Sequence, residues 1–238
     1  MVGGRDLHEA VTKILENKKF ESRQSRDKRV LVEGMDLRSC QFLFCSLAAS
    51  DVRDRATIRS VRLFDCTAEA SRIGGAVIDE VLVEGLTTNG IFRLTAPALR
   101  HVTLRGQIEE ILVHPAIWPG PATPEQQRGF DEANAAFYSE VDWALDITEA
   151  EFGAVEIQGV PARLVRRDPD SQVVVRRENA LTRRWRGLGL EDTPWPGMIQ
   201  FLIDDGYPEK LLIAPKRHSN YNRLREGLMT LKAAGVAE

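Results

Sequence analysis

The fold is decided by residues 35–54, which read MDLRS-CQFLF-CSLAA-SDVRD when they are divided into groups of five. The third residue of each group is apolar, and this five-residue step continues to Leu104 after two shifts of one residue. The apolar residues on the step are Leu37, Phe42, Leu47, Val52, Ile58, Leu63, Ala68, Ile73, Ile78, Val83, Leu94, Leu99 and Leu104. Five residues turn about 140° around a helix and alternate between the faces of a strand, so neither element keeps these side chains on one side. We therefore expect the chain to turn a corner about every five residues, as in a square solenoid.

A second position in each group of five holds a compact residue. Two residues before most centres lie Cys40, Cys45, Ser50, Ala56, Val61, Cys66, Ser71, Ala76 and Val81. These side chains and the apolar centres would fill the narrow interior of a coil. Four steps close one turn, which predicts that Ile58, Ile78 and Leu99 stack on one another. The same spacing predicts a stack of Leu63, Val83 and Leu104.

In this pattern residues 35–54 resemble the pentapeptide-repeat proteins, and the resemblance extends over about residues 30–115. It implies a right-handed square β-helix of about four coils. An irregular sheet or another type of solenoid is the alternative. The later groups of five are degenerate, and the chain lacks the abundant Asn or Asp that precedes each central residue in typical members.

The breaks in the pattern predict four segments. Residues 1–29 are expected to hold a capping helix over residues 5–20, with Leu7, Val11, Ile14 and Leu15 on one face. Residues 30–115 form the β-helix, and residues 116–122 form a proline-rich linker. Residues 123–238 form a small α+β domain. The predicted fold class is therefore mainly β plus α+β.

The second domain shows mixed signals. Thr123, Pro124 and Glu125 predict a helix start, with the helix running toward Tyr138. The other expected elements are a hairpin of residues 155–157 and 162–166, strands at 173–175 and 211–214, and helices at 179–186, 198–205 and 219–234. We recognise no family in this part of the chain.

Length and composition set outer bounds. A chain of 238 residues can hold two modest domains. Because the sequence contains neither a membrane-spanning apolar run nor a signal sequence, we expect a cytoplasmic protein without membrane contact. Three cysteines without metal-ligand spacing predict no metal and no cofactor. Cys45 and Cys66 would lie one coil apart, near disulfide distance, although reduced thiols fit the interior better.

Charge gives the main functional signal. Residues 161–190 carry eight arginines and three acids, whereas residues 139–158 contain acids and no Lys or Arg. We predict a binding site for a partner or an anionic ligand at Arg163, Arg166, Arg167, Arg176, Arg177, Arg183, Arg184, Trp185 and Arg186. A solvated, salt-bridged surface is the alternative. The solenoid segment 30–115 carries eleven acids and nine arginines, too balanced for a DNA mimic unless its charges segregate by face.

Catalytic patterns are sparse. His8, His101, His114 and His218 have no metal-ligand spacing, and Asp142 and Asp146 suit an ordinary helix end as well as a paired-acid site. We therefore expect a non-catalytic protein-interaction scaffold of the antitoxin, immunity-protein or adaptor type. The alternatives are a phosphate- or nucleotide-binding domain or enzyme in residues 123–238, and nucleic-acid binding through residues 163–186. A homodimer could form at an open coil end after Val113.

Overall fold

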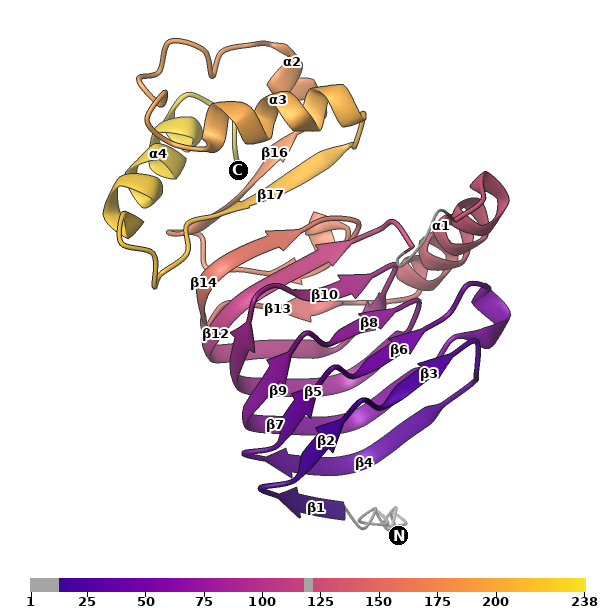
Figure 1. The fold of residues 1–238 in the computed structure, drawn as a ribbon. Helices are drawn as coiled ribbons and strands as arrows, with labels where there is room; N and C mark the ends of the chain where they lie inside the picture. Colours follow the sequence, from indigo (N-terminus) through magenta and orange to yellow (C-terminus); the bar gives the residue numbers. More distant parts are fainter. Residues whose placement is uncertain (1–12, 118–121) are drawn as a thin grey trace, which may run out of the picture.

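The computed structural model describes residues 13–117 and 122–238, and its main element is one large parallel sheet. The strands follow one another in space in the order β1 (Lys13–Glu16), β4 (Leu31–Arg38), β7 (Thr57–Glu69), β9 (Val77–Asn89), β12 (Val102–His114), β10 (Phe92–Thr95), β8 (Arg72–Gly74), β6 (Ser46–Ala48) and β3 (Gln24–Arg26). The sheet curls along this path into a half-barrel (Figure 1).

Six shorter or later strands extend the sheet. They are β2 (Lys19–Glu21), β5 (Gln41–Leu43), β11 (Ala98–Arg100), β13 (Leu145–Asp146), β14 (Ala150–Ile157) and β15 (Val165–Arg166). β2 pairs with β5, β5 pairs with β7, and β11 pairs with β9. β13 and β14 pair with β12, and β15 pairs with β13. All of these strands pair in parallel, so each turn of the chain adds a strand that runs in the same direction as its neighbour.

The curl comes from one residue in the left-handed backbone conformation in almost every group of five. These residues lie two positions after an apolar centre, and they include Ser39, Phe44, Ser60, Asp65, Ala70, Gly75, Glu80, Gly85, Ala96, His101 and Gly106. Positive φ is costly for residues other than glycine. Parallel hydrogen bonds offset this cost, because the bent residue still donates to the next strand, as Ser39 N does to Phe64 O at 2.9 Å. The five-residue step is thus a periodic bend of the strands.

The expected right-handed square β-helix with a capping helix is wrong. β7, β9 and β12 are each continuous 13-residue strands that pass through the expected corners. Because backbone pairing continues through each bend, the strands form a single curled sheet instead of four flat faces around a closed coil.

The expected helix over residues 5–20 is also wrong where the structure describes it. β1 and β2 are strands, and Leu15 and Phe20 pair with Leu37 and Phe42. The five-residue step therefore begins earlier in the chain than the sequence suggested, and pairing with β4 and β5 favours the extended form. Residues 5–12 of the expected helix lie outside the described part of the chain.

The predicted stacks are confirmed. Ile58 pairs with Ile78, which pairs with Leu99. In the same way Leu63 pairs with Val83, which pairs with Leu104. These side chains form the interior of the half-barrel, and the hydrophobic core of the sheet is continuous along it.

A short insertion changes the register of the cysteines. The 3-10 helix η1 (Val52–Asp54) lengthens one turn of the chain, so that Gln41 pairs with Thr67 and Cys40 lies beside Cys66. The backbone N–H of Cys45 instead donates a hydrogen bond to the Ser71 hydroxyl, at 2.9 Å. All three cysteines are free, and burial raises the pKa of the Cys66 thiol. The expected juxtaposition of Cys45 and Cys66 is therefore wrong.

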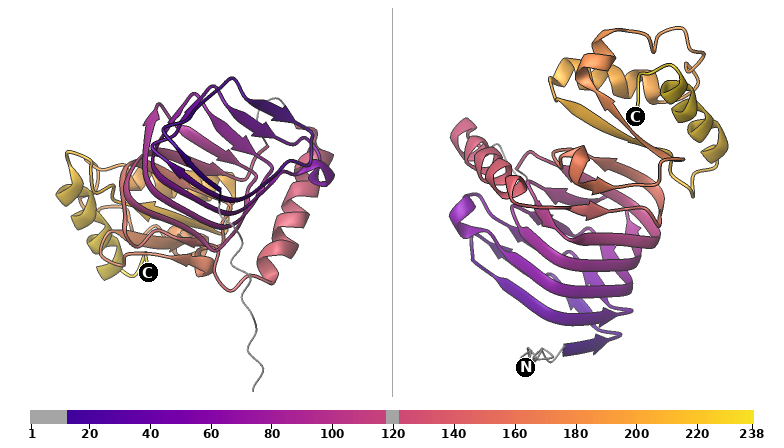
Figure 2. Two further views of the ribbon diagram at one scale, coloured as in Figure 1. Left: turned by 90° about the horizontal axis from the view of Figure 1, so that it is seen from below. Right: turned by 180° about the vertical axis from the view of Figure 1, so that it is seen from behind.

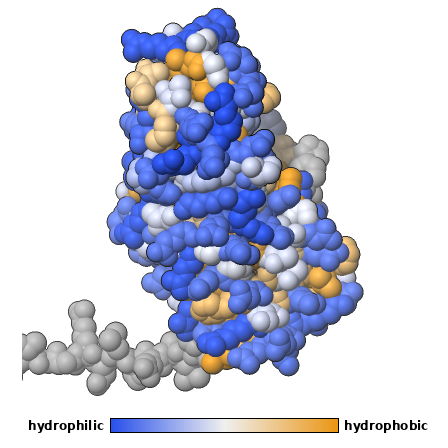
Figure 3. Space-filling model, turned by 90° about the vertical axis from the view of Figure 1, so that its left-hand side faces the viewer, coloured by the Kyte–Doolittle hydropathy of each residue, from blue (hydrophilic) through white to orange (hydrophobic). Residues whose placement is uncertain are grey.

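Ion pairs between neighbouring strands neutralise charges of the sheet. Arg59 pairs with Glu33, Arg62 with Asp36, Arg100 with Asp79 and Arg105 with Glu84. In each pair the two residues come from adjacent strands, so acids and arginines alternate in space. Within these four pairs the charges therefore do not segregate by face. The face seen in Figure 3 is mainly hydrophilic, with small separate apolar groups.

The helix predicted at Thr123–Glu125 is confirmed as α1 (Pro124–Ser139). The Thr123 hydroxyl accepts a hydrogen bond from Gln126 N, and the Gln126 side chain accepts one from Thr123 N. Phe130 and Tyr138 bury the inner face of α1, which lies along one side of the half-barrel (Figure 2). Of the expected linker 116–122, residues 118–121 lie outside the described part.

The expected hairpin of residues 155–157 and 162–166 is wrong. β14 pairs in parallel with β12, and the chain returns through the 3-10 helix η2 (Ala162–Leu164) to place β15 beside β13. The parallel edge of β12 offered β14 a long run of hydrogen bonds, which a local hairpin would have forgone. This edge of β12, which β14 covers, is also the edge at which a homodimer contact was expected.

The last part of the chain forms a smaller α+β layer (Figure 1). The antiparallel pair β16 (Gln172–Arg176) and β17 (Glu209–Ile213) packs with α2 (Arg177–Leu181), α3 (Trp195–Asp205) and α4 (Tyr221–Ala233). Both strands, α3 and α4 match predicted elements. The helix expected over residues 179–186 is too long, since α2 ends at Leu181 and Arg183 has φ of 57°. The predicted segment boundaries at residues 29, 115 and 122 stay predictions.

Candidate functional site

The structure separates the nine residues of the predicted arginine site into buried, occupied and exposed groups. Trp185 is 6% exposed, and its indole Nε1 donates to Ala180 O at 2.9 Å. The ring belongs to the core formed by α3, α4, β16 and β17. It therefore cannot stack on a nucleobase without leaving that core.

Several arginines are engaged within the protein. Arg163 donates to Tyr138 O at 3.1 Å, and Arg177 donates to Ile203 O at 3.4 Å. Arg176 forms ion pairs with Glu238 at 2.7 Å and with Glu209 at 3.5 Å. Arg167 is half-buried and donates weakly to Ala162 O at 3.5 Å. These contacts tie strands and loops together.

Three arginines and two apolar side chains remain exposed in the segment after α2 and on the nearby elements. Arg183, Arg184 and Arg186 follow α2, and no ion pair to any of them occurs in the described part of the chain. Leu181 is 49% exposed and Phe201 is 63% exposed. Arg186 donates to the Gln200 side chain at 3.2 Å, which connects this turn to α3 next to Phe201. We call Leu181, Arg183, Arg184, Arg186 and Phe201 the Arg–Phe patch.

Arg166 belongs to a different cluster. Its guanidinium lies 4.2 Å from the centre of the Trp143 ring, and the other neighbour of that ring is His101 at 4.7 Å. The imidazole Nε2 of His101 lies 2.7 Å from Asp142 Oδ1, and this hydrogen bond lowers the pKa of Asp142. This contact could not be predicted from the sequence, because His101 and Asp142 are 41 residues apart. Asp142 is open to solvent, with its side chain 73% exposed.

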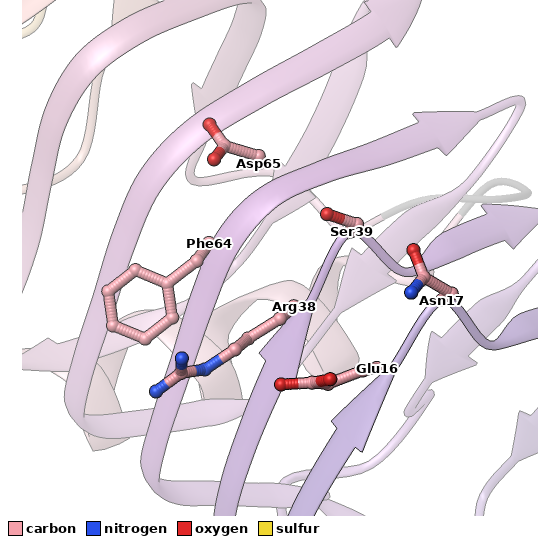
Figure 4. Close-up of a pocket in the computed structure, with 6 residues that line it drawn as sticks. All are labelled: Glu16, Asn17, Arg38, Ser39, Phe64 and Asp65. Atoms are coloured by element: carbon pink, nitrogen blue, oxygen red, sulfur yellow. The ribbon is translucent and has the colours of Figure 1, made fainter.

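A polar pocket of about 420 Å³ lies where β1, β4 and β7 bend. It is lined by Glu16, Asn17, Arg38, Ser39, Phe64 and Asp65 (Figure 4). Arg38 lies 5.5 Å from the centre of the Phe64 ring and 3.9 Å from Asp36. The pocket thus holds carboxylates on both sides of an arginine that already has partners.

A larger apolar cavity of about 490 Å³ lies inside the half-barrel. Its walls are the inward residues of the five-residue step, among them Leu37, Leu63 and Val83. One end reaches Leu145, which is 1% exposed and closed off by β13 and β14. The other end reaches Lys13, Phe20 and Arg23 in the first strands. Such a volume falls in the range of about 300–1,000 Å³ that is typical of small-molecule sites.

The cavity was not foreseen from the sequence. The five-residue step predicted which side chains face inward, but their packing depends on the width of the curled sheet. Leu63, Val83 and Leu94 remain only partly buried because the sheet holds its walls apart. An apolar interior with partly accessible walls makes this cavity a candidate ligand site.

Other predicted candidates do not converge. His114 is half-buried, and burial lowers its pKa. His218 is exposed in the loop before α4, and His8 lies outside the described residues. Over residues 13–117 and 122–238, no group of three or more His, Cys, Asp or Glu side chains could hold a metal ion. Asp146 accepts hydrogen bonds from Thr148 and lies 3.9 Å from Arg166.

Comparison with protein-family models, with curated proteins and with solved structures finds no match to this chain. In the described part of the chain, none of the helices has the length and apolar character needed to cross a membrane.

Proposed function

We propose that this chain is a non-catalytic binding protein that docks one acidic protein partner through the Arg–Phe patch. The observation that carries the proposal is the 63% exposure of Phe201, next in the chain to the Gln200 that Arg186 contacts, on a helix whose opposite face is packed. Aromatic and arginine side chains provide a large share of the binding energy in protein interfaces.

The support beneath the patch is rigid. Ile199 and Leu202 on α3 are buried in the same core as Trp185. Because these contacts fix α3 and the turn after α2, the exposed side chains lose little backbone freedom on binding. A preorganised apolar centre with a cationic rim suits an acidic partner surface that carries an apolar side chain of its own.

The charge of the patch sets the sign of the partner. Arg183 and Arg184 are exposed without an acidic neighbour in the described residues, whereas Arg176 in the same segment is neutralised by Glu209 and Glu238. Unpaired guanidinium groups attract carboxylates over a Debye length of about 8 Å at physiological salt. Association should therefore be faster at low ionic strength.

The experiment compares the tagged chain with Phe201→Ser and with the double variant Arg183→Glu/Arg184→Glu. Each is used to capture proteins from native lysate, with and without nuclease, and bound proteins are identified by mass spectrometry. The matched control is Arg93→Glu, an exposed arginine on β10. A protein retained by the parent and by the control, but lost by both patch variants, supports the proposal.

Two results would contradict it. Retention of the same protein by all variants would place the binding surface elsewhere. Loss of the bound material on nuclease treatment would favour the nucleic-acid alternative, and it would be accompanied by a steep decrease in affinity with salt.

A further inference from the structure

The apolar cavity of the half-barrel has a cationic mouth. In the first turn of the chain, Lys13 occupies the register position that Met35 holds in the next turn. Lys18 and Arg23 hold the positions of Cys40 and Cys45, because their carbonyls accept hydrogen bonds from Gln41 N and Ser46 N. Lys28 continues the same five-residue step. We call Lys13, Lys18, Arg23 and Lys28 the basic ring.

The basic ring differs in residue type from the same register positions in the inner turns of the chain. At the equivalent positions further along the cavity, Val61, Cys66 and Ala76 are small and buried. The cations of the basic ring therefore lie at one end of the cavity. Lys13 and Arg23 line the cavity directly together with Leu15 and Phe20.

The basic ring carries excess charge. Residues 13–29 contain seven Lys or Arg and three acids. Two of these acids, Glu21 and Asp27, form ion pairs with Lys19 and Arg26, which are not among the cavity-lining residues. In the described part of the chain, no ion pair involves a member of the ring. An anion at the mouth would meet uncompensated positive charge.

Among residues 13–117 and 122–238, the first strands form one end of the sheet. There, β1, β2 and β3 each pair with a strand on one side only, namely β4, β5 and β6. The view from below in Figure 2 looks onto this end of the half-barrel. The opposite end is closed by buried side chains such as Leu145 and Phe152. A ligand that enters the cavity therefore passes the basic ring.

We infer that the half-barrel binds a long-chain fatty acid, with the acyl chain in the apolar cavity and the carboxylate at the basic ring. An uncharged hydrocarbon would use the walls and leave the ring unpaired. A phosphate or nucleotide would pair with the ring but leave the apolar walls exposed. A single-chain carboxylate satisfies both, since each apolar methylene that leaves water contributes about 0.8 kcal/mol.

The proposal is tested on the full chain with palmitate, by displacement of the fluorescent fatty acid cis-parinaric acid and by calorimetry. We expect one palmitate per chain. Hexadecanol, which has the same chain length and no charge, should bind more weakly. Lys13→Gln/Arg23→Gln should weaken palmitate binding about tenfold and leave hexadecanol binding nearly unchanged. The matched control is Lys19→Gln/Arg26→Gln, which removes two cations from the neighbouring strands β2 and β3, outside the cavity lining.

Filling the cavity gives the second arm. Val83→Phe adds volume at a partly buried wall residue and should abolish binding of both ligands. If its unfolding temperature shows that it does not fold, Ala68→Leu makes a smaller addition to the same wall. Absence of palmitate binding to the parent would overturn the proposal. Equal palmitate binding by the parent and by the filled variant would also overturn it. The same holds if neither protein binds palmitate and both adsorb equally to phosphatidylglycerol vesicles. The Arg–Phe patch lies at the end of α2, in the turn after it and on α3, so failure here leaves the proposed partner binding untouched.

Discussion

The guanidinium of Arg100 donates two hydrogen bonds to the carboxylate of Asp79, from Nε at 2.7 Å and from Nη2 at 2.5 Å. Asp79 is only 4% exposed, and the two residues are direct partners between β9 and β11. The pair therefore joins two turns of the sheet at a position where an unpaired carboxylate would be costly.

Arg100→Leu should destabilise the protein by about 2 kcal/mol, because it leaves the Asp79 carboxylate buried without its partner. Thermal and urea unfolding measure the change. The matched control is Arg59→Leu, whose partner Glu33 is exposed, and its unfolding midpoint should stay close to that of the parent. Equal destabilisation by both variants would show that burial of Asp79 has no special role.

Leu63→Asp should prevent soluble folding. Leu63 pairs with Leu37 and Val83 on the wall of the cavity, so the variant places a carboxylate among apolar side chains at a cost of several kcal/mol. Expression, solubility and far-UV circular dichroism provide the readout. Leu63→Met, which nearly conserves volume, should fold. A soluble Leu63→Asp protein with the parent's melting temperature would show that this register is wrong.

Thr123→Ala should lower the stability by about 1 kcal/mol, because Gln126 N loses its side-chain acceptor at the start of α1. This corresponds to a decrease of about 2–4 °C in the unfolding temperature for a chain of this size. Thr123→Ser keeps the hydroxyl and should restore most of the loss. If the serine variant melts like the alanine variant, the hydroxyl does not cap the helix.

The buried hydroxyl of Tyr138 should make the free energy of unfolding depend on pH in the alkaline range. Burial raises the pKa of its hydroxyl to about 12, above the ordinary value of 10.0. The folded state therefore holds the proton more tightly than the unfolded state, so this contribution is complete below pH 10 and is lost as the pH rises toward 12.

The free energy of unfolding, measured by urea titration from pH 9 upward, should fall less steeply in Tyr138→Phe than in the parent. The phenylalanine variant should have a lower free energy of unfolding at pH 9, because it loses the hydrogen bond that Tyr138 Oη accepts from Leu99 N at 3.2 Å. Parallel slopes for the parent and Tyr138→Phe would disprove the contribution.

The arrangement of inward residues was predictable because it is a local property. A left-handed residue every five positions, such as Asp65 or Glu80, repeats the same bend, so the spacing of Ile58, Ile78 and Leu99 already encoded their stacking. The same local reasoning failed for residues 13–21. Ile14 and Leu15 fit one face of a helix, whereas Leu15 and Phe20 fit the five-residue step, and pairing with β4 and β5 decided between the two.

The candidate site was less predictable. The clustering of arginines in residues 163–186 was visible in the sequence, but their accessibility was not. Trp185 folds into the core because Ala180 O satisfies its indole N–H, while Arg183 and Arg184 stay outside. Which cation is neutralised depends on acids that arrive from β17 and from the end of the chain, such as Glu209 and Glu238.

The amino-acid sequence by itself determined the five-residue step, the inward side chains, the start of α1 and the elements β16, β17, α3 and α4, because each depends on periodicity or on capping residues close in the chain. Only the tertiary structure decided that the strands form one curled sheet, that β14 lies in parallel on β12, and that the inward residues enclose a cavity with Lys13 and Arg23 at its mouth. These features depend on hydrogen bonds and packing between turns of the chain, and the spacing within one turn carries no information on how widely the turns open.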